Sequence, residues 1–198
     1  MKIKIFGLGA IGSNLLVQLV RQFPDNEYEG IDFDKVEDRN IRTQAYFLEH
    51  IGQPKVNAIR AVCQRYTRKF KYTPVNTEIK SPPFKNHYPG QGRFKEELWV
   101  DCFDNSKSRK LLETVGEDYN ILHLGFSPFY TAECIWAKDY DAPGDVDPAG
   151  NDICEMADAI GFINYFVNLS VMVISDFLEN GNKSNFAVTS KIKVRRLG

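Results

Sequence analysis

The stretch that decides the fold is residues 1–34, MKIKIFGLGAIGSNLLVQLVRQFPDNEYEGIDFD. Residues 2–6 alternate in polarity, which predicts a β-strand, and Gly7 then opens a glycine-rich turn. Apolar residues recur at helical spacing over residues 11–21, and residues 27–33 predict a second strand. A strand, a helix and a strand in so short a span form a βαβ unit, whose two strands must be parallel.

The remaining sequence continues this α/β pattern. A helix is expected to begin at Gln53-Pro54, because proline favours the first helical turn. The sequence also predicts strands at 71–77, 98–102, 120–125, 131–137 and 186–195, helices at 106–115 and 153–178, and loops at 81–92 and 139–151. We therefore expect one domain spanning residues 1–198, with a three-layer Rossmann-like α/β fold. Its sheet should be mainly parallel, with antiparallel strands added in the C-terminal half.

The composition is that of a globular protein without a strong net charge. Of the 198 residues, 43% are hydrophobic, and 25 Lys and Arg residues nearly balance 26 Asp and Glu residues. Such a balance provides no whole-protein field to attract nucleic acid or an anionic membrane, so we expect neither partner. Residues 159–175 carry no charge, but polar residues interrupt them and Asp158 and Asp176 flank them, which favours a buried core helix over a membrane span.

The cysteines and histidines predict little metal or relay chemistry. The four cysteines are too far apart in sequence for a CxxC pair, so we expect no zinc site, and reduced thiols in a cytoplasmic protein. Cys154 is the best candidate for a thioester nucleophile, because a helix N-terminus favours the thiolate, whereas Cys102 and Cys134 fall within predicted strands. The three histidines, His50, His87 and His123, are scattered, and the sequence predicts no charge relay among them.

Three glycines and one carboxylate predict a nucleotide site. Gly7, Gly9 and Gly12 lie between a strand and a helix, where glycine lets backbone N–H groups approach a phosphate at the helix N-terminus. Asp32 ends the second strand about 20 residues beyond Gly12, the position from which a carboxylate binds ribose hydroxyls. The alternative is a loop-capping aspartate beside a turn that packing alone restricts to glycine. Both an ATP enzyme and a dinucleotide dehydrogenase fit these features.

Further blocks distinguish between those two enzymes. Asp32-Phe-Asp34 ends the second strand, Asn40-Ile-Arg-Thr-Gln44 follows it, Gly52-Gln-Pro-Lys55 begins a helix, and Asp101-Cys-Phe-Asp104-Asn105 precedes Arg109. These blocks resemble, in the same order, the D-F-D, N-L-x-R-Q, G-x-P-K and D-x-x-D-N…R segments of the ThiF/MoeB/HesA family. The members of this family are adenylyltransferases similar to ubiquitin-activating enzymes.

The resemblance implies a function and roles for particular residues. It implies adenylation of a carboxylate by ATP, with the C-terminus of a small ubiquitin-like protein or peptide as partner, in a homodimer. Asp32 would bind the ribose, and Asp34 would also belong to the nucleotide site. Asn40 and Lys55 would bind the triphosphate, and Asp104 would hold Mg²⁺. Structural alternatives are a solvated lysine at position 55 and a helix cap at position 104.

One departure from the family pattern keeps other functions open. The family's arginine position holds Thr43, and Arg42 stands one residue earlier. Arg42 is therefore our candidate for the missing catalytic arginine. The family's usual zinc-binding CxxC pairs are absent as well. A non-catalytic nucleotide-binding or scaffold member of the family is the first alternative, and an NAD-dependent oxidoreductase is the second.

Overall fold

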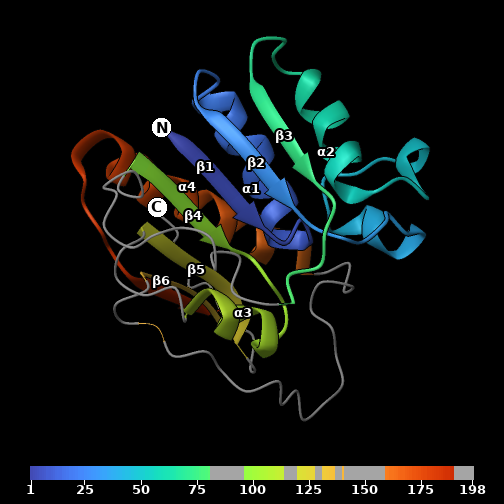
Figure 1. Cartoon of the computed structure of the whole chain (residues 1–198). Helices are drawn as coiled ribbons and strands as arrows, with labels where there is room; N and C mark the ends of the chain where they lie inside the picture. The colour runs from blue at the N-terminus through green and yellow to red at the C-terminus, as the bar shows by residue number, and fades with distance from the viewer. Residues whose placement is uncertain (81–95, 114–119, 128–130, 137–139, 141–158, 190–198) are drawn as a thin grey trace, which may run out of the picture.

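A computed structural model describes residues 1–80, 96–113, 120–127, 131–136, 140 and 159–189 (Figure 1). Its centre is a seven-stranded sheet with the order β3-β2-β1-β4-β5-β6-β7. Strands β1 to β5 are parallel, and β6 and β7 add in antiparallel orientation, as the sequence predicts. The strands are β1 (Lys2–Phe6), β2 (Glu27–Ile31), β3 (Lys71–Val75), β4 (Glu97–Asp101), β5 (Asn120–Ser127), β6 (Thr131–Trp136) and β7 (Phe186–Thr189).

Helices cover both faces of this sheet and make three layers. They are α1 (Ala10–Gln22), α2 (Lys55–Gln64), α3 (Ser106–Glu113) and α4 (Ile160–Asn180), and two 3₁₀ turns, η1 (Asp38–Arg42) and η2 (Leu48–His50), lie between β2 and α2. One core cluster joins buried residues of α1, α2 and α4 to one face of the sheet, including Ile3 and Ile5 of β1. On the other face, Leu112 of α3 packs in a smaller cluster with Phe6 and Trp99. The predicted Rossmann-like architecture is therefore confirmed.

The strand register determines where a ligand site can form. Phe6 at the end of β1 pairs with Ile31 of β2 on one side and with Asp101 of β4 on the other. The chain segments that follow these three strands consequently leave the sheet at the same edge. Sheet order also reverses at β1, since β2 and β3 lie on one side of it and β4 and β5 on the other. Ligands of open α/β sheets bind at such a switch point.

The element boundaries differ from prediction in small ways. Strand β2 ends at Ile31 rather than at residue 33, and α4 continues to Asn180, where Gly181 adopts a left-handed conformation (φ 73°) and its N–H donates to the Phe177 carbonyl. The predicted start of this helix at residue 153 lies outside the described residues. The same holds for residues 190–195 of the last strand, for the loop at 81–92 and, apart from Tyr140, for the loop at 139–151.

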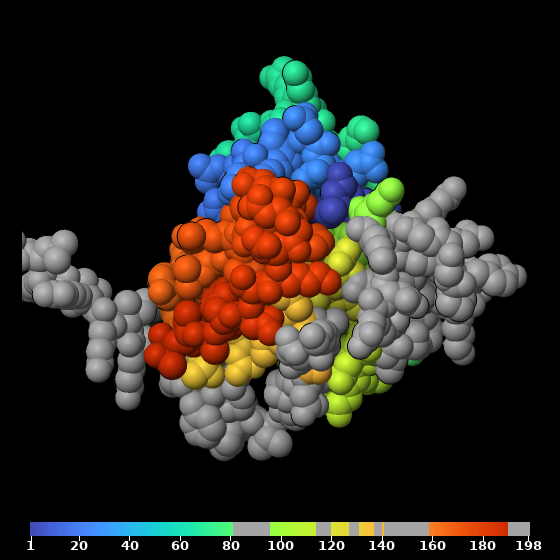
Figure 2. Space-filling view, turned by 90° about the vertical axis from the view of Figure 1, so that its left-hand side faces the viewer, coloured from blue at the N-terminus to red at the C-terminus, as the bar shows by residue number. Residues whose placement is uncertain are grey.

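Helix α4 is apolar because one of its faces is a core face. Among the described helices it is the one long and apolar enough, by length and composition, to cross a membrane. It packs along α1, and its buried residues include Ile163 and Phe166, both without exposed surface, whereas Tyr165 and Met172 are exposed. Figure 2 shows α4, in orange and red, running over this face of the molecule. Packing against α1 and the sheet therefore accounts for much of its apolar character.

We predict that two truncations on α4 differ strongly in their effect. Ile163→Ala removes a fully buried side chain and should lower the free energy of unfolding by about 2–5 kcal/mol. Met172 is 67% exposed, so Met172→Ala on the same helix should change it by less than about 0.5 kcal/mol. Urea unfolding followed by circular dichroism measures both. Equal effects of the two substitutions would contradict the assignment of a core face.

Candidate functional site

The glycine turn between β1 and α1 contains glycines of two kinds. Gly7 has a φ of 86°, and a Cβ there would lie 2.9 Å from the Cys102 carbonyl oxygen. A Cβ on Gly12 would lie only 1.9 Å from the Gly7 carbonyl oxygen. Packing therefore requires glycine at both positions. A Cβ on Gly9 would meet no protein atom within 4 Å, so this position, just before α1, leaves open space in which a ligand could approach the backbone.

Asp32 directly follows β2 and holds the glycine turn through its carboxylate. One oxygen accepts the Leu8 N–H at 2.7 Å, and the other accepts the Asp34 N–H at 2.8 Å. Burial raises the pKa of this carboxyl, while nearby Lys55 and the two backbone donors act in the opposite direction. The loop-capping role considered for Asp32 is thus realised. Because a carboxylate has about four lone-pair sites, acceptor capacity remains for ligand hydroxyls.

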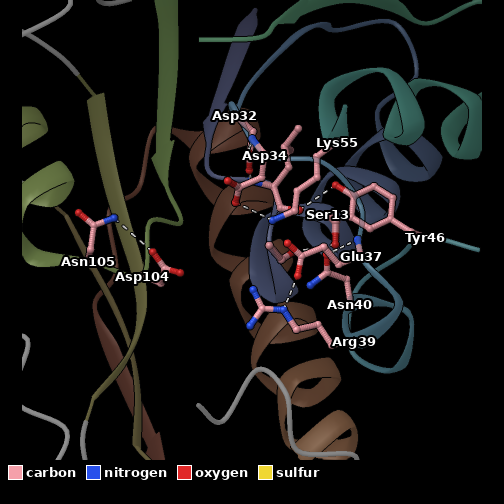
Figure 3. Close-up of polar contacts among 12 residues, drawn as sticks. Ser13, Asp32, Asp34, Glu37, Arg39, Asn40, Tyr46, Lys55, Asp104 and Asn105 are labelled. Atoms are coloured by element: carbon pink, nitrogen blue, oxygen red, sulfur yellow. Dashed lines mark hydrogen bonds and ion pairs between the residues drawn. The ribbon is translucent and has the colours of Figure 1, made fainter. Parts of the chain in front are cut away.

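Lys55 is a buried cation rather than a solvated lysine at a helix start. It is the first residue of α2, and only 7% of its surface is exposed. Its Nζ lies 3.0 Å from Asp34 Oδ2, and its backbone N–H donates to the Asp34 carbonyl. Figure 3 shows Lys55 extending towards Asp34 beside Asp32. The ammonium group is therefore held at the edge of the sheet where β1, β2 and β4 end.

The loop after β2 is fastened to the start of α1. The backbone carbonyl of Thr43 accepts a hydrogen bond from Asn14 Nδ2 at 2.8 Å, and Ser13 Oγ accepts the Ala45 N–H at 3.1 Å. Tyr46 donates its hydroxyl to the Leu8 carbonyl at 2.8 Å. The loop is consequently positioned against the same turn that carries the glycines.

Within this loop, the candidate phosphate-binding residues differ in exposure. Asn40 is 8% exposed, and its Oδ1 accepts the Glu37 N–H at 2.9 Å, which leaves its Nδ2 to donate elsewhere. Thr43 has no exposed surface. Arg39 and Arg42 are exposed, and Arg39 is paired with Glu37. The position of the family arginine therefore faces the interior, whereas its neighbour Arg42 faces solvent.

Asp104 stands in the turn after β4, on the other side of β1 from Lys55. It is exposed, and its Oδ1 accepts a hydrogen bond from Asn105 Nδ2 at 3.2 Å. The cap of α3 is Asn105, whose Oδ1 accepts the Ser108 N–H at 2.8 Å, so Asp104 is not the helix cap. Figure 3 shows Asp104 and Asn105 apart from the group around Asp32 and Lys55. The described residues contain no cluster of three or more His, Cys, Asp or Glu that could hold a metal ion without a ligand's help.

One buried polar cluster was not predicted from the sequence. The cysteines that fall in predicted strands are buried, as expected for core residues. His123 Nδ1 lies 2.8 Å from Asp101 Oδ2, a buried pair that the scattered histidines of the sequence gave no sign of. The cysteines Cys102 and Cys134 are buried, and burial raises the pKa of the Cys134 thiol to about 12, which disfavours the nucleophilic thiolate. Cys154 and His87 lie outside the described residues.

We predict that the glycines of the turn respond differently to an added methyl group. Gly12→Ala forces a backbone clash and should lower the free energy of unfolding by about 1–3 kcal/mol or more. The methyl group in Gly9→Ala meets open space, so it should leave that free energy within about 0.5 kcal/mol of the wild-type value. Thermal and urea unfolding of the two variants provide the comparison. A Gly9→Ala loss as large as that of Gly12→Ala would show that packing restricts both positions.

Comparison with known proteins identifies the family. Solved structures with a similar fold include E. coli MccB with ATP (16% identity, TM-score 0.71), which covers 98% of this chain, and PaaA (16%, 0.66), which covers 96%. E. coli MccB has also been solved with MccA, again at 16% identity and a TM-score of 0.71. The chain spans only 61–62% of the length of these structures, and no curated protein sequence matches it. The ThiF family model matches residues 1–137, so the chain belongs to the ThiF family.

Proposed function

We propose that this protein is an ATP-dependent adenylyltransferase that activates the terminal carboxylate of a peptide or small ubiquitin-like protein. The observation that carries the proposal is the convergence of the open Gly9 backbone, Asp32 and the buried Lys55 cation at one edge of the sheet. The family and the fold shared with an ATP-bound structure of E. coli MccB support it.

In the proposed complex, Asp32 accepts the ribose hydroxyls and Gly9 faces the phosphates. The N-terminus of α1 adds N–H groups and a positive dipole end, both of which favour phosphate. Asn40 can donate from its Nδ2, because its Oδ1 is already occupied by the Glu37 N–H. Asp34 orients Lys55 through the 3.0 Å ion pair, so we assign Asp34 to the nucleotide site through Lys55.

The proposed chemistry needs stabilisation of charge more than a protein nucleophile. An oxygen of the acceptor carboxylate attacks the α-phosphorus of ATP, and the bond from that phosphorus to the bridging oxygen of the β-phosphate breaks. Acyl-adenylate and pyrophosphate are the products. Lys55 would neutralise the charge that builds on the departing pyrophosphate. The buried position of the ammonium group keeps that charge preorganised.

Asp104 would hold Mg²⁺ together with phosphate oxygens. It is exposed at the sheet edge, and its Oδ1 accepts a hydrogen bond from Asn105 Nδ2 at 3.2 Å. A single carboxylate fits Mg²⁺, which keeps several waters and takes its remaining ligands from substrate phosphates. Bound in this way, Mg²⁺ would neutralise charge on the triphosphate.

The proposed partner and assembly are supported by the family and by the similar structures. E. coli MccB, solved with MccA, supports a bound polypeptide-like partner as the source of the carboxylate. We also propose a homodimer, since Tyr165 and Met172 remain exposed on the apolar helix α4. Phe162 and Phe166, by contrast, already pack inside the chain and are not available for such an interface.

A non-catalytic family member is the second candidate function, and Thr43 favours it. Thr43 has no exposed surface and carries no charge, so this position supplies no positive charge to the phosphates. Unless Arg42 supplies the missing positive charge, the protein would bind nucleotide without activating a carboxylate. The two functions therefore differ in turnover rather than in nucleotide binding.

We predict that Mg-ATP binds more tightly than NAD. Asp32→Ala should weaken ATP binding by about 1–3 kcal/mol, the usual cost of leaving ligand hydroxyls unpaired. Gly9→Ala should also weaken it while the protein stays folded, because the methyl group occupies the space of the phosphate. Isothermal titration calorimetry measures each affinity. Binding of NAD with no detectable heat from ATP would contradict the ATP assignment and favour an oxidoreductase.

We predict that Lys55→Ala reduces turnover far more than ATP affinity. Loss of one preorganised charge at the leaving group typically costs about 10²–10³ in rate. The assay is exchange of labelled pyrophosphate into ATP, with polypeptides encoded by neighbouring genes as acceptors. Lys35→Ala is the matched control, because Lys35 is an exposed lysine in the loop between β2 and α2. It should leave the exchange rate unchanged.

The same pyrophosphate-exchange assay distinguishes the proposed enzyme from a non-catalytic scaffold protein. A large loss of exchange in Arg42→Ala would show that Arg42 has replaced the family arginine. Wild-type protein that binds ATP but exchanges no pyrophosphate with any acceptor carboxylate would exclude the enzyme and leave the scaffold.

A further inference from the structure

A buried polar cluster lies between β4, α3 and β5, next to the turn that carries Asp104. None of its residues takes part directly in the proposed chemistry. Its members are Asp101 at the end of β4, Arg109 of α3, His123 of β5, and Tyr140. Asp101 and His123 have no exposed side-chain surface, and that of Arg109 is 8% exposed. Burying so many polar groups costs free energy unless they form hydrogen bonds or ion pairs with one another.

The contacts within the cluster close a ring. Asp101 Oδ2 accepts from His123 Nδ1 at 2.8 Å, since a carboxylate can only accept. The His123 ring stacks on the Tyr140 ring, with centroids 3.8 Å apart and planes 6° from parallel. Arg109 Nη1 donates to the Tyr140 hydroxyl at 2.9 Å and lies 4.0 Å from Asp101 Oδ2.

Arg109 also anchors α3 to the sheet. Its Nη2 donates to the Leu124 carbonyl of β5 at 2.9 Å. A Cβ on Gly125 would lie 2.4 Å from that Nη2, so the guanidinium occupies the space that glycine leaves free. Burial alone would lower the pKa of Arg109, but the charge of Asp101 and the bond to Tyr140 raise it. The guanidinium therefore stays charged inside the protein.

The cluster controls both ends of the turn that carries Asp104. At the β4 end, Asp101 Oδ1 accepts the Phe103 N–H at 3.0 Å and so shapes the chain just before Asp104. At the α3 end, Arg109 lies in the first helical turn, where its N–H donates to the Asn105 carbonyl. Because His123 holds Oδ2 of Asp101, Oδ1 stays directed at Phe103. Within the described part of the chain, Asp104 itself forms no hydrogen bond or ion pair with any of the four side chains.

We propose that His123 is a positioning residue, which fixes the Asp101 carboxylate and thereby, through Phe103, the turn that presents Asp104 at the nucleotide site. This proposal rests on the proposed function only for the role of Asp104. Without the His123 donor, the Asp101 carboxylate is free to rotate towards Arg109, and the bond to Phe103 is lost. The turn then samples several positions, and Asp104 is no longer preorganised for a cation.

Hydrogen exchange of the Phe103 amide, followed by NMR, tests the positioning directly. His123→Phe keeps a ring against Tyr140 but removes the donor, and should speed exchange of this amide by roughly tenfold, the factor expected for one lost hydrogen bond to a charged group. His123→Asn can place its Nδ2 where Nδ1 stood and should restore slow exchange. Exchange of the β1 amides should stay unchanged in both variants. An unchanged Phe103 amide in folded His123→Phe, or no rescue by His123→Asn, would overturn the proposal.

Two further variants make the test specific. His50→Phe is the matched control: His50 is another buried histidine, which accepts from the Phe47 N–H, and its loss should leave the Phe103 amide protected. Should His123→Phe not fold, Tyr140→Phe takes its place. That variant keeps the stacked ring, frees Arg109 Nη1 to pull on Asp101, and should also speed Phe103 exchange.

The role of Asp104 has its own readout, the ratio of ATP dissociation constants without and with Mg²⁺. In wild-type protein Mg²⁺ should tighten ATP binding, and His123→Phe should lose most of that gain while its affinity for metal-free ATP is retained. Faster Phe103 exchange in a protein whose ATP affinity never responds to Mg²⁺ would support the positioning by His123 and contradict the metal role of Asp104. The two proposals therefore fail separately.

Discussion

The close approach of Gly12 to the Gly7 carbonyl is the constraint on which the rest of the site depends. A single Cβ at Gly12 would lie 1.9 Å from that oxygen, and one at Gly7 would press on the backbone of Cys102. This contact brings the start of α1 against the ends of β1 and β4. The Leu8 N–H then meets Asp32 after β2. Three strand ends are thus joined through one turn, in which Gly7 and Gly12 leave no room for a side chain.

The charges at this edge of the sheet explain why a phosphate ligand would need positive charge in addition to the backbone N–H groups of the glycine turn. Two carboxylates, Asp32 and Asp34, face one buried ammonium group, that of Lys55. A triphosphate would bring further negative charge into a region that is already slightly acidic. Binding of a triphosphate would therefore depend on the dipole of α1, on a cation such as Mg²⁺ and on any arginine that can reach the phosphates. We therefore propose that the exposed Arg42, beside the buried Thr43, decides whether the protein is active.

Local patterns predicted the fold and part of the site. The alternation in β1, the helical spacing in α1 and the glycines are short-range signals, so the βαβ unit and a mainly parallel sheet with antiparallel strands at its end could be predicted from the sequence. The burial of Lys55 could not, because it depends on the Asp34 carbonyl and carboxylate across a loop. The Asp101–His123 pair was missed for a similar reason, since it exists only once β4 and β5 pair in register.

Asp101 and Asp104 belong to one motif but have different roles, because one is buried and the other is exposed. They are three positions apart, yet Asp101 has no exposed surface and Asp104 is exposed. A buried carboxylate must satisfy its lone pairs within the protein, and Asp101 does so with Phe103 and His123, with the Arg109 charge nearby. An exposed carboxylate keeps its lone pairs for water or a cation. Because the first group defines the backbone on which the second stands, rigidity at Asp101 allows Asp104 to remain exposed, with a hydrogen bond from its neighbour Asn105, and still be held in one place.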